Sequence, residues 1–293
     1  MRLGFATDIH LDHIKATHDL GKQKRVGAEL TKHVDALVVG GDISVGKYLE
    51  AHLGAFLEGA ACPVYFVLGN HDFWLMHEDS IWGIAKSFEG SLDFSGPVEL
   101  TPDTALVGVS GWYDTRAGDW MSPGIIMPEF QTTTRLMNLG PVQVGRNQLV
   151  WPPELKHEMH RVCQAWADEQ TAKFMPKLEE AAEKYRKVFI VTHIPPWVES
   201  CWSPTGKRPC LSRDNSPEWL PWSVNVGLGM KIEALAEDYP DIQFQVLSGH
   251  THGEGETKLD WNLRAFSGKA SYGIPKLARV FEVEEDRPLW DPE

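Results

Sequence analysis

The sequence predicts an α/β fold, because short apolar runs alternate with stretches of helical periodicity along much of the chain. Three apolar runs, Arg2–Thr7, Ala36–Val39 and Val64–Leu68, have the length of buried strands, and polar residues follow each of them at once. Lys15–His33 and Gly46–Ala60, which lie between these runs, are expected to be helices. Strands that alternate with helices in this way are typical of parallel sheets.

The second half of the chain repeats the strand pattern around one long helix. Pro152–Lys184 is expected to be an amphipathic helix that begins at a proline, and Pro176 is expected to kink or break it. Further buried strands are expected at Ala105–Val109, Lys187–Val191, Ile242–Leu247 and Leu263–Phe266.

Two regions lack clear periodicity and are rich in Gly, Pro and Trp, namely 112–137 and 198–226. We interpret them as parts of insertions, about 112–184 and 198–226, that can overhang a site. We therefore expect a single domain that comprises residues 1–293.

The composition limits the partners. The chain has 28 basic and 41 acidic residues and a net charge of −13, so long nucleic acid is an unfavourable partner. No apolar run is long enough to span a membrane. The first residues lead directly into a strand-like run and do not resemble a signal peptide, so a cytoplasmic location is expected. The oligomeric state cannot be predicted from the sequence.

Five short segments carry side chains that bind transition metals. They supply carboxylates, one amide and several imidazoles but no cysteine, a set that suits Mn, Fe, Co or Zn. Each segment follows a predicted strand, where ligand sites of α/β sheets gather. Alone, each is ordinary turn or strand-end chemistry; together they predict a dinuclear metal site. The segments are Asp8-Ile9-His10, Gly41-Asp42, Gly69-Asn70-His71-Asp72, Thr192-His193 and Gly249-His250-Thr251-His252.

The spacing of two residue pairs suggests how they reach the metals. In an extended chain, Asp8 and His10 point the same way and Ile9 packs inward; His250 and His252 have the same spacing.

Asp42 follows two glycines, whose missing Cβ atoms allow the backbone to approach a crowded centre. Its carboxylate has two oxygens and can bridge two ions, whereas a neutral imidazole cannot.

The ordered motifs resemble those of the calcineurin-like metallophosphoesterase superfamily, from Asp8 to His252. The resemblance implies a four-layer sandwich of two mixed β-sheets flanked by helices, with irregular and helical insertions near the site. It also implies His71 as the catalytic imidazole beside the phosphate. The implied ligands are Asp8, His10, Asp42 and His252 for one ion, and Asp42, Asn70, His193 and His250 for the other.

This ligand set implies metal-dependent hydrolysis of a small-molecule phosphate ester. Two divalent ions about 3.5–4 Å apart can activate a bridging hydroxide and bind the phosphoryl oxygens for in-line attack. His71 would donate a proton to the leaving oxygen or stabilise its charge.

Departures from the family pattern bear on the substrate. Several branches have an acidic residue three positions after the bridging Asp, which orients the catalytic imidazole; Val45 stands there, and Ser44 or a backbone carbonyl is a hypothetical substitute. The Arg-Gly of protein Ser/Thr phosphatases is absent, and Asp72 replaces their Glu. We therefore expect a phosphodiesterase, with a phosphomonoesterase or nucleotide phosphatase as the alternative. A catalytically silent scaffold is disfavoured because every expected ligand type is present, and a nuclease because of the acidic charge.

Three further residues are candidates for substrate contacts. Trp112 and Trp197 lie just after predicted strands and could form an apolar wall for a leaving group, although packing is the commoner role of such residues. Arg116 is a candidate for a phosphate contact.

Overall fold

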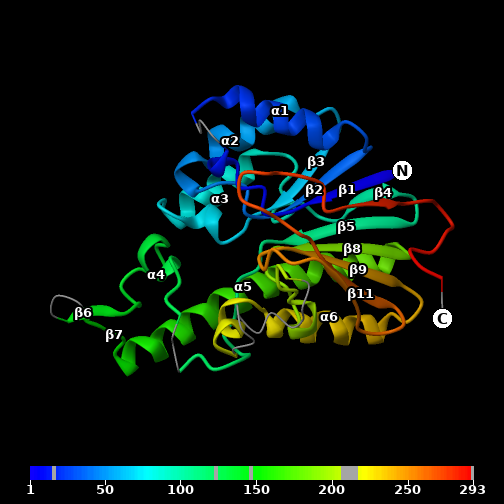
Figure 1. Cartoon of the computed structure of the whole chain (residues 1–293). Coiled ribbons are helices and arrows are strands. Elements are labelled where there is room, and N and C mark those ends of the chain that lie inside the picture. The colour runs from blue at the N-terminus through cyan, green and yellow to red at the C-terminus, as the bar shows by residue number, and fades with distance from the viewer. Residues whose placement is uncertain (15–17, 122–124, 145–147, 206–216, 292–293) are drawn as a thin grey trace.

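The computed structural model describes residues 1–14, 18–121, 125–144, 148–205 and 217–291. In these residues, two mixed β-sheets lie face to face (Figure 1), the first with strand order β12-β1-β2-β3 and the second with order β10-β11-β9-β8-β5-β4. The first sheet contains β1 (Arg2–Ala6), β2 (Ala36–Gly40), β3 (Val64–Val67) and β12 (Arg279–Glu282). The second contains β4 (Val98–Thr101), β5 (Thr104–Val109), β8 (Lys187–Thr192), β9 (Gln243–Ser248), β10 (Gly255–Lys258) and β11 (Leu263–Ser267).

The inner strands are parallel, and antiparallel strands lie only at sheet edges. In the first sheet β12 is antiparallel to β1, and in the second β10 and β4 are antiparallel to their neighbours. Because the inner strands are buried on both faces, their sequences are continuous apolar runs and do not alternate. Phe5, Val38, Phe189 and Leu247 belong to the apolar core that joins the two sheets.

Helices cover the outer face of each sheet and complete the expected four layers (Figure 1). The helices on the first sheet are α1 (Leu20–Thr31), α2 (Gly46–Gly59) and α3 (Glu78–Ser87). Those on the second are α5 (Pro153–Lys184) and α6 (Val226–Asp238). The predicted α/β sandwich of two mixed sheets is thus confirmed.

Helix α1 is shorter than the predicted helix Lys15–His33. The side chain of Asp19 accepts a hydrogen bond from the backbone N–H of Gly21 and caps the helix, so it begins at Leu20. Residues 15–17 lie outside the described residues.

Helix α5 continues through Pro176 and has Pro153 in its first turn, where a proline is tolerated. Its second half buries Phe174 and Leu178 in the apolar cluster that includes β5 and β8. This burial outweighs the expected break at Pro176. The expected insertion 112–184 therefore ends in a helix that forms part of the outer layer.

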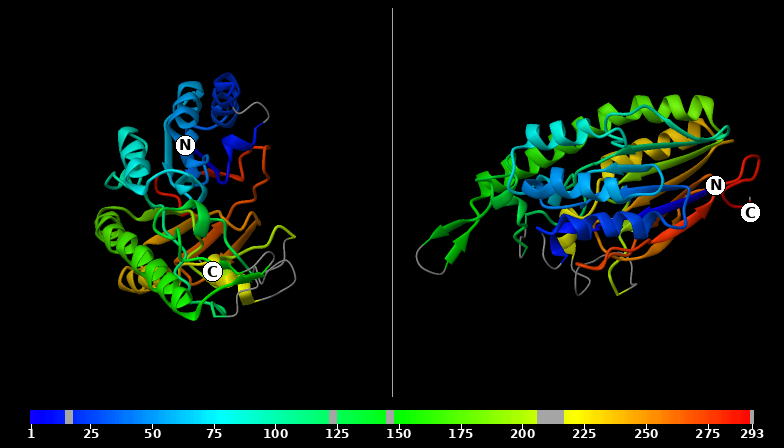
Figure 2. Two further views of the ribbon diagram at one scale, coloured as in Figure 1. Left: turned by 90° about the vertical axis from the view of Figure 1, so that its left-hand side faces the viewer. Right: turned by 90° about the horizontal axis from the view of Figure 1, so that it is seen from above.

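The part of this insertion that precedes α5 lies beyond the carboxyl ends of the strands. It includes the short helix α4 (Glu129–Thr132) and the hairpin of β6 (Val142–Val144) and β7 (Gln148–Val150), which projects from the body in Figures 1 and 2. Short 3₁₀ helices occur at η1 (Leu11–His13), η2 (His71–Phe73), η3 (Val198–Ser200) and η4 (Pro217–Trp222).

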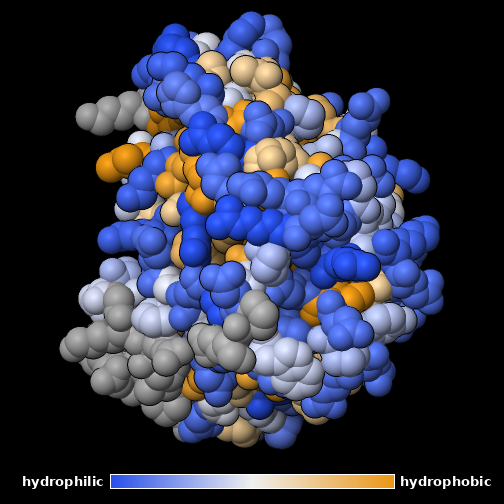
Figure 3. Space-filling model, turned by 90° about the vertical axis from the view of Figure 1, so that its right-hand side faces the viewer, coloured by the Kyte–Doolittle hydropathy of each residue, from blue (hydrophilic) through white to orange (hydrophobic). Residues whose placement is uncertain are grey.

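Polar side chains cover most of the surface on one side of the molecule (Figure 3). The face in Figure 3 is mostly hydrophilic, with smaller hydrophobic areas between the polar side chains. Among the described residues, no helix combines the length and the apolar character needed to cross a membrane.

Candidate metal centre

Neighbouring strands bring the five motifs to one edge of the sandwich. β1, β2 and β3 are parallel neighbours and lead into Asp8, Asp42 and Asn70. β8 and β9 are parallel neighbours in the other sheet and lead into His193 and His250. Parallel strands end at a common edge, so residues far apart in sequence meet there.

Five of the seven expected ligands have a left-handed backbone conformation, which costs a non-glycine residue about 1–2 kcal/mol. Their φ angles are 50° for Asp8, 39° for His10, 50° for Asp42, 66° for His250 and 56° for His252. The expectation of two extended pairs is therefore wrong, because the chain turns at each of these residues. Ile9 still packs inward, at 1% exposure. Strain concentrated in this way is typical of functional sites.

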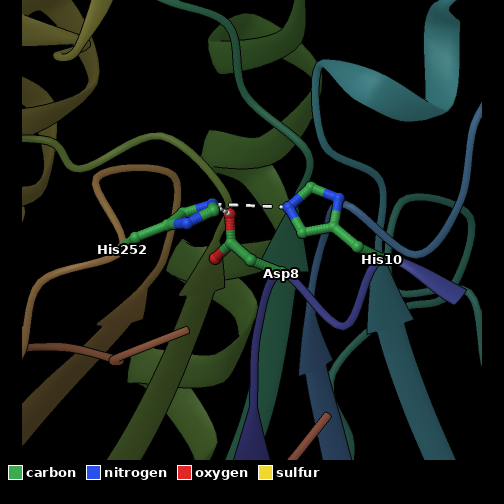
Figure 4. A group of neighbouring side chains, drawn as sticks. All are labelled: Asp8, His10 and His252. Atoms are coloured by element: carbon green, nitrogen blue, oxygen red, sulfur yellow. Dashed lines mark hydrogen bonds and ion pairs between the residues drawn. The ribbon is translucent and has the colours of Figure 1, made fainter. Parts of the chain in front are cut away.

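The first donor group consists of Asp8, His10 and His252. Nε2 of His10 lies 3.3 Å from Nε2 of His252, which lies 3.2 Å from Oδ1 of Asp8. Figure 4 shows the two rings converging on the Asp8 carboxylate from opposite sides. Oδ2 of Asp8 accepts a hydrogen bond from the Thr7 hydroxyl, at 2.6 Å, and this contact fixes the carboxylate.

The second donor group consists of Asn70, His193 and His250. Oδ1 of Asn70 lies 2.9 Å from Nε2 of His193 and 3.0 Å from Nδ1 of His250. Asp42 lies between the two groups. Its Oδ1 is 3.4 Å from Nε2 of His193, and its Oδ2 is 3.7 Å from Nε2 of His10.

The tautomers of His193 and His250 follow from the hydrogen bonds of the ring nitrogens that face away from Asn70. Nδ1 of His193 donates to the carbonyl oxygen of Gly40 at 2.9 Å, and Nε2 of His250 donates to that of Trp222 at 2.7 Å. Burial lowers the pKa of both imidazoles, so at neutral pH each carries one proton, on the nitrogen that donates. The nitrogens that face Asn70 Oδ1 therefore carry lone pairs.

Lone pairs thus face an amide oxygen at hydrogen-bond distance without a proton between them. Such a cluster of acceptors requires a cation. Two ligands held 2.0–2.1 Å from one ion lie about 2.8–3.4 Å apart in octahedral or tetrahedral geometry, which matches both donor groups. Three sets of buried or partly buried acidic and histidine residues have the spacing of a metal site: Asp8, His10 and His252; His10, Asp42 and His71; and Asp8, Asp42 and His193.

Close backbone approach requires glycine at two positions. A Cβ on Gly41, where φ is +88°, would lie 2.6 Å from Nδ1 of His193, and a Cβ on Gly69 would lie 2.2 Å from Oδ1 of Asp42. The expectation drawn from the glycines before Asp42 therefore holds for Gly41.

Asp72 organises the loops that follow β2 and β3. Its buried carboxylate accepts from the N–H groups of Gly69 and Ser44, both at 2.7 Å, and of Ile43 at 3.2 Å. The loop that carries Asp42 is thereby joined to the loop that carries Asn70.

His71 faces the centre, and stacking holds it there. Its Nε2 is 3.8 Å from Oδ2 of Asp42, while its ring stacks on Trp74 at 3.6 Å between centroids. Its Nδ1 is buried and has no hydrogen-bond partner among the described residues. Ser44, the hypothetical partner, is wrong for this role, because its hydroxyl lies 2.8 Å from Nδ1 of His52.

Two neighbours of the centre have no motif in the sequence. Glu129, from α4, is fully buried and accepts hydrogen bonds from Nδ2 of Asn70 and, at 3.3 Å, from Nε1 of Trp74. Tyr272, from the loop after β11, lies with its ring centroid 4.4 Å from that of His10 and 5.0 Å from that of His252. No local pattern distinguishes either residue.

Three other candidates lie elsewhere. Trp112 is fully buried and stacks on Trp166, and Trp197 packs in the core beneath the second sheet. Neither forms a wall of the site. Arg116 contacts both carboxylate oxygens of Asp168, at 2.8 and 2.7 Å, which engages its guanidinium.

The sequence matches the family model of calcineurin-like phosphoesterases over residues 1–254. The chain belongs to the calcineurin-like phosphoesterase family. The family is one of metal-dependent phosphoester hydrolases with divalent ions at a dinuclear site, and the donor groups fit such a site. The expected family and enzyme class are thus confirmed.

Solved structures share this family fold over nearly the whole chain. Phosphopantetheinyl hydrolase from Mycobacterium tuberculosis has a TM-score of 0.61 at 15% identity, with 99% of this chain and 98% of that chain covered. A dimetal phosphatase from Danio rerio has a TM-score of 0.58 at 16% identity, with 98% and 93% covered. No curated protein sequence matches the chain significantly.

Proposed function

We propose that this calcineurin-like phosphoesterase hydrolyses a small-molecule phosphodiester at a two-metal centre. The observation that supports it most strongly is the pair of donor groups on either side of Asp42, each at the spacing of ligands around one ion. Asp8, His10 and His252 would hold one ion; Asn70, His193 and His250 would hold the other; and Asp42 would bridge them.

Bound divalent ions would supply an activated water molecule and positive charge for the phosphoryl oxygens. The residues of the chain would balance the charge of the ions and assist the leaving group. Asp8 and Asp42 contribute two negative charges, which leaves about two of four positive charges to be balanced by an ester anion and the attacking group. His71, held 3.8 Å from Asp42, would donate to the leaving oxygen or stabilise its charge.

The charges around the centre favour a diester over a monoester. A diester carries one negative charge and a monoester about two at neutral pH, so a monoester needs more cationic contacts. Within the described residues, none of the ion pairs and hydrogen bonds of the seven proposed ligands involves Lys or Arg. The Tyr272 ring, which is half exposed beside His10, offers an apolar surface for a second ester group.

The test compares bis(p-nitrophenyl) phosphate with p-nitrophenyl phosphate in the presence of Mn²⁺. We expect a higher kcat/KM for the diester and loss of activity with a chelator. A higher kcat/KM for the monoester would replace this proposal with a phosphomonoesterase or nucleotide phosphatase. No turnover of either ester, with two ions bound, would favour the binding scaffold.

A phosphopantetheinyl ester is a useful third substrate, given the fold shared with a phosphopantetheinyl hydrolase. The metal pair (Mn, Fe, Zn or Co), a single domain over residues 1–293 and a cytoplasmic location stay predictions.

A further inference from the structure

We propose that Glu129 is a positioning residue that holds the Asn70 amide toward the metal centre and the Trp74 indole against His71. Glu129 belongs to α4, in the first irregular region, and lies 59 positions after Asn70. The inference rests on the proposed metal centre and adds to it a residue from outside the five motifs.

The first step concerns the orientation of Asn70. Nδ2 of Asn70 donates to a carboxylate oxygen of Glu129, so the NH₂ group of the amide faces Glu129. The amide oxygen is then turned toward the lone pairs of His193 and His250, at 2.9 and 3.0 Å. Without this acceptor, rotation of the amide would place N–H donors where a cation needs an oxygen.

The second step concerns His71. The oxygen of Glu129 that accepts from Asn70 also accepts from the indole N–H of Trp74, at 3.3 Å. Trp74 in turn stacks on His71 with 24° between the ring planes. Val45 stands at the position of the acidic residue that orients this imidazole in several branches, and Nδ1 of His71 has no partner among the described residues. The Glu129–Trp74 contact therefore supplies an orienting device of a different kind.

The third step concerns why α4 lies against the loop after β3, which carries Asn70 and Trp74. The N–H of Leu75 donates to the carbonyl oxygen of Thr132 at 2.9 Å, and Arg135 pairs with Glu78 of α3. These contacts join the residues that follow Glu129 to the loop after β3 and to the start of α3. These contacts fix the backbone near Glu129 and so the position of its carboxylate, as a positioning group requires.

The fourth step concerns the free energy of burying Glu129. Its side chain is fully buried, its Oε2 has no hydrogen-bond partner among the described residues, and no ion pair of Glu129 occurs there. A carboxylate buried without a cation destabilises the folded state. Divalent ions at the neighbouring donor groups would offset this charge. The burial of Glu129 is therefore accounted for by its contact with Asn70 and not by a gain in the stability of the fold.

The experiment measures Mn²⁺ binding to the full chain by titration calorimetry, which requires no substrate. Glu129→Met removes the acceptor at similar side-chain volume, and Glu129→Gln keeps an acceptor oxygen. We expect Glu129→Met to weaken one of the two Mn²⁺ sites by about 10–100-fold, the usual effect of losing a group that orients a ligand. Glu129→Gln should stay close to the unmodified protein. Glu233→Met, at an exposed position of α6, is the matched control and should change nothing.

Asn70→Ala separates failure of this inference from failure of the proposed centre. If Asn70→Ala binds two ions normally, the ligand assignment itself is wrong. If Asn70→Ala weakens one site while Glu129→Met does not, only the role of Glu129 is overturned. Equal losses in Glu129→Gln and Glu129→Met would also overturn it, because orientation by an acceptor oxygen would then not be the cause.

Trp74→Phe tests the contact with His71. This variant keeps an aromatic ring beside His71 but lacks the N–H that Glu129 accepts. With Mn²⁺ saturating and a chromogenic ester as substrate, we expect kcat to fall about 10-fold in Trp74→Phe and in Glu129→Met, with a smaller change in KM. If both variants keep the kcat of the unmodified protein at saturating Mn²⁺, Glu129 does not act on His71 through Trp74.

Discussion

Nε2 of His250 lies 2.7 Å from the carbonyl oxygen of Trp222, a contact that joins the second tryptophan-rich region to the metal centre. Because a carbonyl can only accept, this ring nitrogen carries the proton, and Nδ1 presents its lone pair to the centre. Glu129 has the corresponding role in the first region, through Asn70. Both irregular regions therefore contribute contacts that orient the expected ligands from the motifs.

We expect Asp42→Asn to abolish binding of the metal pair and nearly all turnover. The variant keeps the size of the side chain but removes one of two negative charges and the second oxygen of equal donor strength, so it cannot bridge two ions. Metal content and diester hydrolysis measure the effect, with Asp238→Asn at the exposed end of α6 as control. Two retained ions with unchanged turnover would rule out the bridging role.

We expect His71→Ala to retain both ions and to slow hydrolysis by about 10²–10⁴-fold. The His71 side chain is 12% exposed and faces Asp42, so it can reach a bound ester. The other four histidines of the centre belong to the two donor groups and are expected to bind the ions. The measurement is kcat with metal content determined on the same samples. A normal kcat would remove His71 from the mechanism.

The inner strands and the motifs were predictable because each depends on local sequence. Buried parallel strands are continuous apolar runs, and polar residues directly after them mark the edge where ligands gather. The edge strands β4 and β12 were not predicted because they are short and partly exposed, so they lack such runs. Helix α6 was missed since it directly follows an irregular, proline-rich region.

The neighbours of the expected ligands were harder to predict than the motifs that carry these ligands. Glu129 and Tyr272 come from segments without periodicity, and only tertiary packing brings them to the site. Trp112 and Trp197 are core residues, which agrees with the commoner role of such residues and not with the alternative of an apolar wall. The left-handed turns at Asp8 and His250 also escaped prediction, because the spacing of the pairs alone suggests an extended chain.

We expect metal ions to raise the thermal unfolding temperature. Ions that bind only the folded chain stabilise it by RT ln(1 + [M]/Kd), about 2.7 kcal/mol at 100 times Kd. They would also relieve the contact between unprotonated acceptors at Asn70. Calorimetric scans with Mn²⁺ and with a chelator measure the shift. Asp42→Asn should show none, and an equal shift in that variant would place the stabilising ions elsewhere.

We expect Gly59→Ala to destabilise the fold by about 1–3 kcal/mol, because helices α1 and α2 pack backbone to backbone. A Cβ on Gly59 would lie 1.9 Å from the carbonyl oxygen of Lys24, so the helices would have to separate. Gly83→Ala, within α3, is the matched control.

At Gly83 nothing lies within 4 Å of the added Cβ. The same substitution should therefore stabilise the fold by about 0.5–1 kcal/mol through higher helix propensity. Urea unfolding measures both variants. Effects of the same sign would contradict the close packing of α1 on α2.

We expect Pro176→Ala to stabilise the fold. Pro176 lies inside α5, where a proline removes a backbone hydrogen bond and costs about 3 kcal/mol. The proline also restricts the unfolded chain of the unmodified protein, which offsets about 0.4–1 kcal/mol of this cost, so a net gain of about 2 kcal/mol is expected for Pro176→Ala. Urea unfolding of Pro176→Ala, beside Glu179→Ala on the exposed face of the same helix, measures this gain.

The sign of the Pro176→Ala effect tests why α5 is continuous. Phe174 and Leu178 lie on either side of Pro176 and are buried against the second sheet. If their packing holds the helix together despite the proline, alanine removes a cost and leaves the packing intact. A lower unfolding midpoint for Pro176→Ala would instead mean that α5 and the sheet fit together only with the local geometry that proline imposes. Diester turnover should be unchanged in either case, because Pro176 is not among the residues placed at the metal centre.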